Sequence, residues 1–501
     1  MEEEMDVYIS GAGLTKFGKS KESLEKIMAE AAGLALKEAQ REKVDAIFIG
    51  VMNVEEFVGE SNFATLLADT IGLTGIPSTR VETASSTGAG AFETGFYAVA
   101  SGYMKNVLVL AGEKMTHLPT SKTTRILSGV IDRTERRYGA TMPAFAAMIA
   151  QRYAHEYQLS LSKLQEILAQ VAIKNHANGA LNPYAQFRKP ITKEDYLRSQ
   201  IISYPLRLYD CAPITDGAAA LLLTSEPTSI KVTGIGHATD TLAVSHRASL
   251  TSFNSTKEAA LKAYRMAQLN PSEIQFAEVH DAFTPFEIIG TEDLGFFPPG
   301  GGWKALEERV TQLRGRLPIN PSGGLKSRGH PVGASGLAQL VEIVFQLRGE
   351  AGEGRQLEKA EIGLAQSIGG LGNNNFVIIL ERSDRKKVYG KGWRPEYQPE
   401  IQTVSKSNLP RPSEGMGILE TFTILHHPPE GFRSPLALGF INLKGGVRIM
   451  ACNPEYKNPH SLKIGRKVLF EPREGLYVFY RLTLWNRLKL WLKKEKRVKK
   501  K

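Results

Sequence analysis

The sequence predicts an α/β protein whose first 384 residues form two similar halves and whose remaining part ends in a small all-β barrel. Strand–helix–strand patterns recur in the two halves in the same order, as in a duplicated fold. Continuous apolar strands, such as residues 106–111, are typical of a sheet covered on both faces. After about residue 415, short strands replace the helices. These observations predict helices packed between and outside two sheets, followed by the barrel.

Length and composition limit the possible classes. The chain has 501 residues, 42% of them apolar, which is enough for two or three domains. No apolar run reaches the roughly 18–20 residues that a membrane span requires. The acidic N-terminus enters a strand directly, so we expect no signal peptide. Cys211 and Cys452 have no paired spacing, which excludes a disulfide framework or zinc cluster and favours a cytosolic protein.

The net charge of +11 is concentrated at one end of the chain. Residues 486–501 hold nine Lys or Arg and one Glu, a contribution of +8, so the other 485 residues carry only +3. The body of the protein is therefore close to neutral, and its charge gives no reason to expect a nucleic-acid partner.

The first half, residues 1–229, contains strands and helices in regular order. A short strand ends in Gly-x-Gly, and a helix with one apolar face follows from Ser23. Between about 115 and 205 polar loops and helices interrupt the pattern, and we interpret this segment as an inserted substrate cap. The other expected elements are a strand at 46–52, a loop and helix at 81–101, a strand at 106–111 and a strand within 208–223.

The second half, residues 230–384, repeats this plan. Residues 231–236 echo the first Gly-x-Gly strand, and closing strands are expected at 362–380. In the place of the segment at 81–101 stands the loop at 320–336, NPSGGLKSRGHPVGASG, in which seven of seventeen residues are Gly or Pro. Such a loop lets a ligand or another backbone approach closely, with His330 at its middle. A Gly-rich turn with an incidental histidine is the alternative interpretation.

The C-terminal part changes character again. Residues 385–414 are polar and contain prolines, which predicts a linker or wrapping arm. Residues 415–485 are expected to form the barrel, and residues 486–501 form a basic tail. The expected barrel strands are 418–425, 436–443, 446–452, 467–472 and 476–482.

Four stretches together resemble a known family. They are ETASSTGAG (82–90), VHDAFT (279–284), GHPVGASG (329–336) and AQSIGGLG (365–372). In this order, in a duplicated α/β frame, they resemble the thiolase superfamily, specifically its sterol-carrier-type and archaeal branch. The resemblance implies a five-layered αβαβα fold for residues 1–384. Residues 385–485 resemble the acyl-CoA-associated OB-fold domain, without the zinc ribbon that often precedes it, so we expect no zinc.

The resemblance also implies roles for particular residues. Ser85 stands at the position of the nucleophilic cysteine, ahead of a buried helix. Ala282 and Ser367 stand where relatives carry the second cysteine, which moves the proton at the α-carbon. His330 and His280 are retained, and the implied oxyanion holes consist of these two histidines with the amides of Ser85 and Gly369. A helix N-terminus and fixed amides are suited to stabilising an enolate.

Serine in place of cysteine changes the expected chemistry. A serine hydroxyl needs a close base to become a nucleophile, and an acyl-serine is a less reactive ester than a thioester. Aldol or retro-aldol chemistry on an acyl-CoA avoids both difficulties, and some superfamily members with an OB partner look like aldolases. We therefore favour aldol chemistry. Acetyl-CoA C-acyltransferase activity through Ser85 and a non-catalytic acyl-CoA-binding scaffold remain the alternatives.

Several candidate residues also have ordinary structural interpretations. The stretch at 85–87 fits a helix N-cap, and Ser367 fits a spacer as well as a proton carrier. Cys211 stands in an apolar context that is typical of a buried, inert thiol. His426 and His427 precede two prolines and predict a solvated loop, whereas residues 176–183 belong to the cap and could reach the acyl pocket.

The remaining predictions concern partners. The substrate is expected to be a coenzyme A thioester, with no tightly bound cofactor. The fold family implies a homodimer or dimer of dimers, and a partner acyl-CoA enzyme is a further candidate. The tail places Leu488, Trp491 and Leu492 at helical spacing among cations. It is either a solvated basic end or a peripheral contact with an anionic membrane, and nucleic acid ranks third. We expect the protein to be cytoplasmic.

Overall fold

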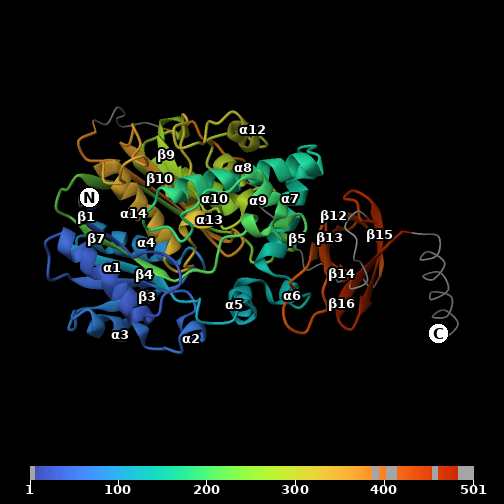
Figure 1. Cartoon of the computed structure of the whole chain (residues 1–501), viewed down its shortest axis with the longest axis horizontal. Coiled ribbons are helices and arrows are strands. Elements are labelled where there is room, and N and C mark those ends of the chain that lie inside the picture. The colour runs from blue at the N-terminus through green and yellow to red at the C-terminus, as the bar shows by residue number, and fades with distance from the viewer. Residues whose placement is uncertain (1–5, 386–393, 402–413, 454–460, 483–501) are drawn as a thin grey trace.

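A computed structural model describes residues 6–385, 394–401, 414–453 and 461–482 of the chain. The two α/β halves form the main body, and the barrel lies at one end of the molecule (Figure 1). The basic tail, residues 486–501, and most of the expected linker lie outside the described residues. Among the described residues, no helix is both long and apolar enough to cross a membrane.

The first half is built on a mixed sheet in the order β3-β2-β4-β7-β1. β7 runs antiparallel to both β1 and β4, whereas β2 runs parallel to β4 and β3. β4 and β7 are buried along almost their whole lengths, as the continuous apolar pattern predicts. The strand bounds are β1 Tyr8–Leu14, β2 Ala46–Gly50, β3 Ser78–Val81, β4 Asn106–Glu113 and β7 Gly217–Thr224.

The second half repeats this topology in the order β8-β11-β10-β9. Two antiparallel pairings are followed by one parallel pairing, the same sequence that relates β1, β7, β4 and β2. β1 and β8 also pair at Tyr8 and Lys231, so the two sheets join into one nine-stranded sheet within the described residues. The strand bounds are β8 Ile230–Thr239, β9 Phe276–Glu278, β10 Ile362–Gly369 and β11 Asn374–Arg382.

Helices cover the sheets in layers, as the repeated pattern predicts. α4 and α14 contact each other and pack between the two halves, against β4 and β10 respectively. α1 covers the outer face of the first half, and α10 covers the outer face of the second (Figure 1). The order is therefore α-β-α-β-α. The helix bounds are α1 Leu24–Glu38, α2 Val54–Phe57, α3 Phe63–Thr70, α4 Thr87–Ala100, α10 Asn254–Ala267, α11 Thr284–Asp293, α12 Gly302–Glu307, α13 Gly324–Arg328 and α14 Ser335–Arg348.

The repeated Gly-x-Gly motif has a packing function in both halves. A Cβ atom on Gly13 would lie 2.1 Å from the carbonyl oxygen of Ala31 in α1. In the second half a Cβ atom on Gly236 would lie 1.8 Å from the carbonyl oxygen of Ala259 in α10. Each outer helix therefore rests directly on the strand backbone, and only glycine permits this approach. The sequence echo reflects the same helix–strand contact made twice.

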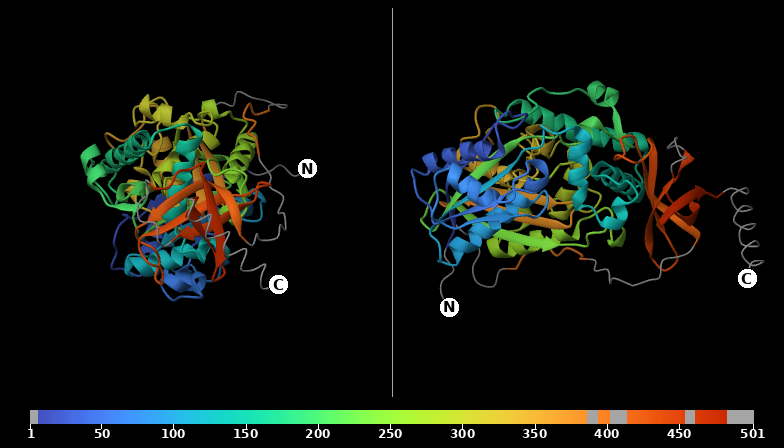
Figure 2. Two further views of the ribbon diagram at one scale, coloured as in Figure 1. Left: turned by 90° about the vertical axis from the view of Figure 1, so that its right-hand side faces the viewer. Right: turned by 90° about the horizontal axis from the view of Figure 1, so that it is seen from below.

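The insertion between β4 and β7 forms a helical cap. Its helices lie between the main body and the barrel, as the right-hand view of Figure 2 shows. A large apolar core joins α7 and α8 to α11 and to the barrel strands. The cap elements are α5 Thr120–Leu127, α6 Arg133–Arg136, α7 Met142–Glu156, α8 Leu161–Ala180, α9 Lys193–Arg198, β5 Ile201–Ser203 and β6 Leu206–Arg207.

The C-terminal strands close into a five-stranded barrel, as predicted for an OB-type domain. Strand β12 closes it by pairing with both β13 and β15. The observed strands begin or end one to three residues from the predicted positions; the largest difference is at β12, which begins at Gly415, before its apolar stretch. The strand bounds are β12 Gly415–Leu425, β13 Leu436–Asn442, β14 Arg448–Asn453, β15 Lys467–Arg473 and β16 Leu476–Arg481.

The barrel is attached to the cap by backbone and side-chain contacts. β12 extends across the barrel to pair with β5 at Leu425 and Ser203. The hydroxyl of Thr421 donates to the carbonyl oxygen of Met148 in α7 at 2.6 Å, and the rings of Phe145 and Phe440 lie 6.1 Å apart. Within the described segments the barrel therefore packs directly against the cap of the α/β body.

The contact between α4 and α14 generates the first prediction. A Cβ atom on Gly88 would lie 2.8 Å from Gly333 O and from Leu337 N, both backbone atoms that cannot move aside easily. Gly88→Ala should therefore lower the free energy of unfolding by about 1–3 kcal/mol, the usual cost of overpacking. Urea unfolding followed by circular dichroism measures this change.

Gly33→Ala is the matched control, because Gly33 lies in the exposed interior of α1 with no heavy atom within 4 Å of its added Cβ. This substitution should raise the free energy of unfolding by about 0.5–1 kcal/mol through the better helix propensity of alanine. Equal effects of the two substitutions would contradict the assigned helix contact.

Candidate active site

The N-termini of α4 and α14 meet beside one cavity. Gly88 near the start of α4 contacts the backbone of Gly333 and Leu337, and a Cβ atom on Gly336 would lie 2.9 Å from Ala89 N. Because small residues lie at this crossing, the segment that precedes α4 can lie close to the segment that precedes α14. Helix N-termini present free amides and a positive dipole end, so the crossing is suited to a developing negative charge.

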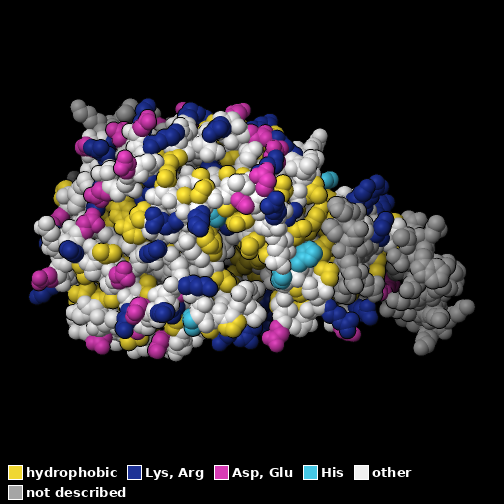
Figure 3. Space-filling view, in the orientation of Figure 1, with side chains coloured by type: hydrophobic (Ala, Val, Ile, Leu, Met, Phe, Trp, Pro, Cys, Tyr) yellow, Lys and Arg dark blue, Asp and Glu magenta, His cyan; other side chains and the backbone are white. Residues whose placement is uncertain are grey.

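The cavity has a volume of about 490 Å³ and extends from these helix ends to the barrel. It brings together three of the predicted residues, Ser85, His280 and His330. Figure 3 shows a hollow floored by hydrophobic side chains, with histidine side chains on its right-hand rim. Its apolar lining is Met52, Met115, Leu127, Val130, Met142, Pro143, Ile202, Leu208, Ala212, Pro213, Ile214, Ala282, Phe283, Phe286, Val332 and Leu425.

Ser85 lies on a tight turn immediately before α4. The preceding residue, Ala84, has a φ of 57°, a left-handed conformation that turns the chain sharply into the helix. Ser85 is only 7% exposed, and its hydroxyl makes no hydrogen bond within the described part of the chain. It is therefore neither an N-cap nor a member of a preformed serine–histidine pair.

The neighbouring Ser86 and Thr87 hold this turn in place. The hydroxyl of Ser86 lies 2.6 Å from the carbonyl oxygen of Thr83 and 2.9 Å from that of Asn374. Thr83 N donates to the Thr87 hydroxyl at 2.9 Å. The stretch at 85–87 does contain the N-cap position of α4, but this position is Ser86 rather than Ser85, and the Ser86 side chain makes no hydrogen bond to a helix amide.

Gly369 lies directly against the same turn. A Cβ atom there would be 2.5 Å from both Thr83 O and the Ser86 hydroxyl. The next residue, Gly370, has a φ of 60° and lines the cavity. The structure therefore brings the backbone around Gly369 next to that of Ser85, the arrangement that a two-amide oxyanion hole would need.

His330 is held in a defined orientation. Its Nδ1 lies 2.7 Å from the hydroxyl of Ser335, which in turn donates to Pro331 O at 2.9 Å. Because that hydroxyl proton is used, Nδ1 carries the imidazole proton and Nε2 keeps its lone pair. Burial, followed by the positive charge of Arg328, lowers the pKa of His330 to about 3. His330 is therefore a neutral base.

His280 faces His330 across the cavity. The two rings are perpendicular, with centroids 5.3 Å apart. The His280 ring is buried, and its Nδ1 has no partner among the described residues. Burial, followed by the neighbouring His330 and Arg328, lowers the pKa of His280 well below its ordinary value. A neutral imidazole without a fixed partner can present an N–H to a substrate oxygen.

Ser367 and Cys211 differ in their position relative to the cavity: Cys211 lines it and Ser367 does not. The Ser367 hydroxyl is buried without a partner in the described chain, 2.7 Å from the Cβ position of Gly336, and the residue does not line the cavity. This placement favours the spacer interpretation over the proton carrier. Cys211 does line the cavity, ahead of β7, but burial raises the pKa of its thiol to about 12. It is a protonated lining residue.

The barrel contributes residues to the cavity that the sequence did not single out as lining residues. Leu425 at the end of β12 and His427 just beyond it line the cavity, and His427 Nε2 lies 2.7 Å from the side-chain nitrogen of Gln200. The prediction of a solvated loop is confirmed for His427, which is exposed in a bend between β12 and β13 and also lines the cavity. Only the apolar end of β12 hinted at a buried contact. The hydroxyl-bearing lining residues Thr120, Thr124, Ser128 and Thr141 were also missed.

A buried carboxyl group, that of Glu113, is hydrogen-bonded to two segments of the cavity wall. Glu113 at the end of β4 accepts hydrogen bonds from Met52 N at 2.9 Å and Gly333 N at 3.2 Å. It thus connects a lining residue of the first half to the loop that carries His330. Burial raises the pKa of Glu113 to about 8, so the carboxyl group is largely protonated at neutral pH.

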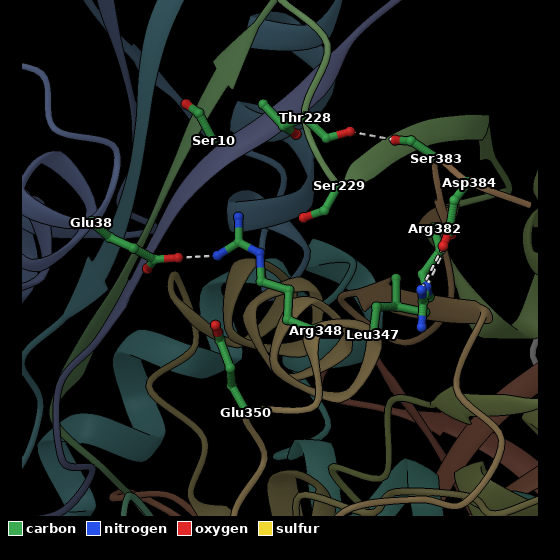
Figure 4. A pocket seen from close by; sticks show the side chains of 10 residues that line it. All are labelled: Ser10, Glu38, Thr228, Ser229, Leu347, Arg348, Glu350, Arg382, Ser383 and Asp384. Carbon is green, nitrogen blue, oxygen red and sulfur yellow. Dashed lines mark hydrogen bonds and ion pairs between the residues drawn. The ribbon is translucent and has the colours of Figure 1, made fainter.

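A second, open crevice of about 690 Å³ lies where the two halves join (Figure 4). Arg348 pairs with Glu38, and Arg382 pairs with Asp384 at 2.6 Å. Its charged groups thus largely neutralise one another, and its lining contains no histidine or cysteine. The crevice is therefore a feature of the junction between β1 and α14 and not a candidate catalytic site.

The comparisons with known proteins agree with this architecture. Residues 7–227 match the N-terminal domain of thiolase, residues 236–382 match the thiolase C-terminal domain-like family, and residues 410–469 match the C-terminal OB-fold domain of ChsH2. The acetyl-CoA acetyltransferase of Methanothermobacter thermautotrophicus is 42% identical over 389 residues, 75% of this chain and all of that protein. The chain belongs to the thiolase superfamily, as the sequence motifs predict.

Other relatives and solved structures extend the likeness. Sterol carrier protein 2 of Bos taurus is 33% identical over 384 residues, which cover 72% of this chain and 70% of that protein. The Ltp2-ChsH2(DUF35) aldolase has a TM-score of 0.66 at 24% identity, over 76% of this chain and 99% of the other. A monomeric SCP2-thiolase-like protein of Mycobacterium smegmatis has a TM-score of 0.70 at 17% identity, over 95% and 99%. Both structures share the fold.

The buried histidines generate a pH prediction. Because burial holds the pKa of His330 near 3, His330 should stay a neutral base well below pH 6.5, where an ordinary histidine is protonated. The acid limb of kcat/KM assigned to His330 should therefore lie below about pH 5. An acid limb near pH 6.5 that disappears in His330→Asn would contradict this.

Stability must be measured over the same pH range. The unfolded chain protonates these histidines near pH 6.5, whereas the folded chain does not, so the unfolded state binds more protons below that pH. The free energy of unfolding should thus fall as the pH drops from 6.5 toward 4. Urea unfolding at each pH separates this loss from a change in the catalytic step.

Proposed function

We propose that this thiolase-superfamily enzyme cleaves or forms a carbon–carbon bond in an acyl-CoA thioester by aldol chemistry. The observation that carries the proposal is the state of Ser85. Ser85 lines the cavity, its hydroxyl makes no hydrogen bond to a base among the described residues, and no cysteine stands at this position. A neutral His330 with a free Nε2 lies in the same cavity. This set supports base and enolate chemistry more directly than acyl transfer through serine.

The proposed step in the cleavage direction uses a β-hydroxyacyl-CoA. His330 Nε2 removes the β-hydroxyl proton, the Cα–Cβ bond breaks, and its electron pair forms the thioester enolate. The hydroxyl carbon leaves as an aldehyde or ketone. The imidazolium then returns the proton to Cα, which gives the shortened acyl-CoA, so atoms and charge balance. The charge on the imidazolium is offset by the enolate that forms beside it.

The enolate oxygen needs donors that are fixed before the reaction. We assign this role to the amides of Ser85 and Gly369 together with an N–H of His280. The close contact of Gly369 with residues 83–86, and the position of His280 opposite His330, support the assignment. Such donors in a site shielded from water contribute strongly to catalysis, typically about 10²–10³-fold for one donor.

The cavity supports an acyl group that is bulky and mostly apolar. Its volume of about 490 Å³ and its largely apolar lining favour such a group over an acetyl group alone. Leu425 of the barrel and Phe286 of α11 form part of the same wall, so the barrel belongs to the acyl site. The same reaction class is supported by the Ltp2-ChsH2 aldolase, whose name includes ChsH2, and by the match of residues 410–469 to the ChsH2 C-terminal OB-fold domain.

Thiolase activity through Ser85 is the second candidate. It is favoured by the relative named acetyl-CoA acetyltransferase and by the position of Ser85 ahead of α4. A scaffold that binds acyl-CoA and passes it on is the third. Homodimer formation and attachment of the basic tail to an anionic membrane stay predictions.

A product panel tests the proposed function. The full chain is incubated with β-hydroxyacyl-CoA and β-ketoacyl-CoA compounds of several lengths, with and without free CoA, and products are identified by mass spectrometry. Aldol cleavage releases an aldehyde or ketone without consuming CoA, whereas thiolysis consumes CoA. Thiolysis alone would overturn the proposal, and binding without turnover of any compound would favour the scaffold.

Paired variants separate the two chemistries. Ser85→Ala removes a hydroxyl but keeps the backbone amide, so aldol activity should fall by less than about 10-fold. His330→Ala should reduce kcat by at least about 10²-fold, because the general base is lost. Ser85→Cys should introduce thiolase-like acyl transfer. Comparable, severe losses in Ser85→Ala and His330→Ala would contradict the aldol assignment.

A further inference from the structure

Two fully buried charged residues lie beside the two histidines. Glu278 and Arg328 are both 0% exposed, and Arg328 Nη1 lies 3.4 Å from Glu278 Oε2. Glu278 stands two residues before His280 at the end of β9, and Arg328 stands two residues before His330 in the Gly-rich loop. One ion pair therefore joins the two segments that carry the facing imidazoles.

The Glu278 carboxylate also holds the Gly-rich loop at a second point. It accepts a hydrogen bond from Ser322 N at 2.9 Å and another from the Ser322 hydroxyl at 2.6 Å. On the far side of His280, Asp281 accepts from Leu325 N at 2.7 Å. Both sides of His280 are thus fastened to the segment that leads to His330.

Burying the guanidinium of Arg328 costs free energy. Besides Glu278, its Nη1 donates to Ala338 O of α14 at 3.1 Å, and its guanidinium carbon lies 5.9 Å from the centroid of the Phe17 ring. Its Nε and Nη2 have no hydrogen-bond partner among the described residues. Buried unpaired donors cost free energy, and an apolar pair of similar size is often at least as stable. Stability alone therefore does not account for a charged pair at this position.

We propose that Arg328 and Glu278 are positioning residues that fix the imidazole of His330 opposite that of His280. This role rests on the proposed function, because it assigns the two histidines to the reaction. The ion pair fixes the segment that carries His280 relative to the segment that carries His330. The glycines of the loop alone would not fix this position. The rings, 5.3 Å apart, are then held at the separation that one substrate oxygen can span.

The charge of Arg328 has a second effect on the same histidines. After burial, the positive charge of Arg328 contributes to lowering the pKa of both His280 and His330. Other titratable groups lie around these residues. Glu342 pairs with Arg355, whereas Lys326 and Asp281 lie on the loop side, and the largely protonated Glu113 lies at Gly333. Removing the Glu278–Arg328 pair should therefore raise the pH at which the two imidazoles titrate.

The test uses the full chain and a double variant, Glu278→Gln with Arg328→Met, which removes both charges at similar volume. The matched control is Glu342→Gln with Arg355→Met, a second buried ion pair whose two side chains are each 1% exposed and which has no histidine two residues away. Thermal unfolding, kcat and KM, and NMR titration of the imidazoles are measured for both, with His280→Asn and His330→Asn used to assign the signals.

We expect the double variant to fold, with kcat at least about 10-fold lower, KM within about 3-fold, and the imidazoles titrating about one pH unit higher. The control should lose a similar amount of thermal stability but keep the wild-type kcat and titration. A folded double variant with wild-type kcat and wild-type titration would overturn the proposal.

Arg328→Lys covers the case in which the double variant does not fold. Only Nη1 of Arg328 contacts Glu278, so a lysine can keep the charge and the pair. It should keep kcat within about 3-fold and leave the imidazole titration unchanged, and a 10-fold loss with wild-type stability would also overturn the proposal. If no CoA thioester is turned over, the proposed function fails, whereas the NMR titration still decides the positioning role.

Discussion

The close crossing of α4 and α14 is the constraint on which the site depends. Gly88 and Gly336 let the two helices approach until the backbone of one touches the other, and this places the turn with Ser85 beside the loop with His330. A side chain at either glycine would separate the halves at the point where their residues converge. The nine-stranded sheet and the outer helices serve as the support that holds these two helices in position.

The site is made of neutral groups in surroundings that penalise charge. Burial keeps both histidines uncharged, raises the pKa of the Cys211 thiol, and keeps Glu113 largely protonated. Water-poor surroundings strengthen each fixed donor, so amides and imidazole N–H groups can stabilise an enolate without a metal ion in the proposed step. The barrel completes this environment, because the end of β12 forms part of the cavity wall.

Much of this architecture follows from local patterns. The two Gly-x-Gly strands, the apolar strands and the loop at 320–336 each predict an element that the structure contains, because periodicity and glycine placement act over short stretches. The motif residues Ser85, His280 and His330 could be named for the same reason. The contact between β12 and β5 could not, since it joins residues more than 200 positions apart. The short helix α13 was also missed, because its five residues lie between glycines.

Serine at position 85 separates an aldolase from a thiolase most clearly, since only a thiolase reaction requires an acyl group on that oxygen. Rapid quenching of the wild-type enzyme during turnover of a β-hydroxyacyl-CoA, followed by mass spectrometry of the peptide containing Ser85, measures this directly. The aldol mechanism predicts an unmodified peptide at every time point while the aldehyde or ketone accumulates. An acyl group on Ser85 that forms and disappears at the turnover rate would contradict it.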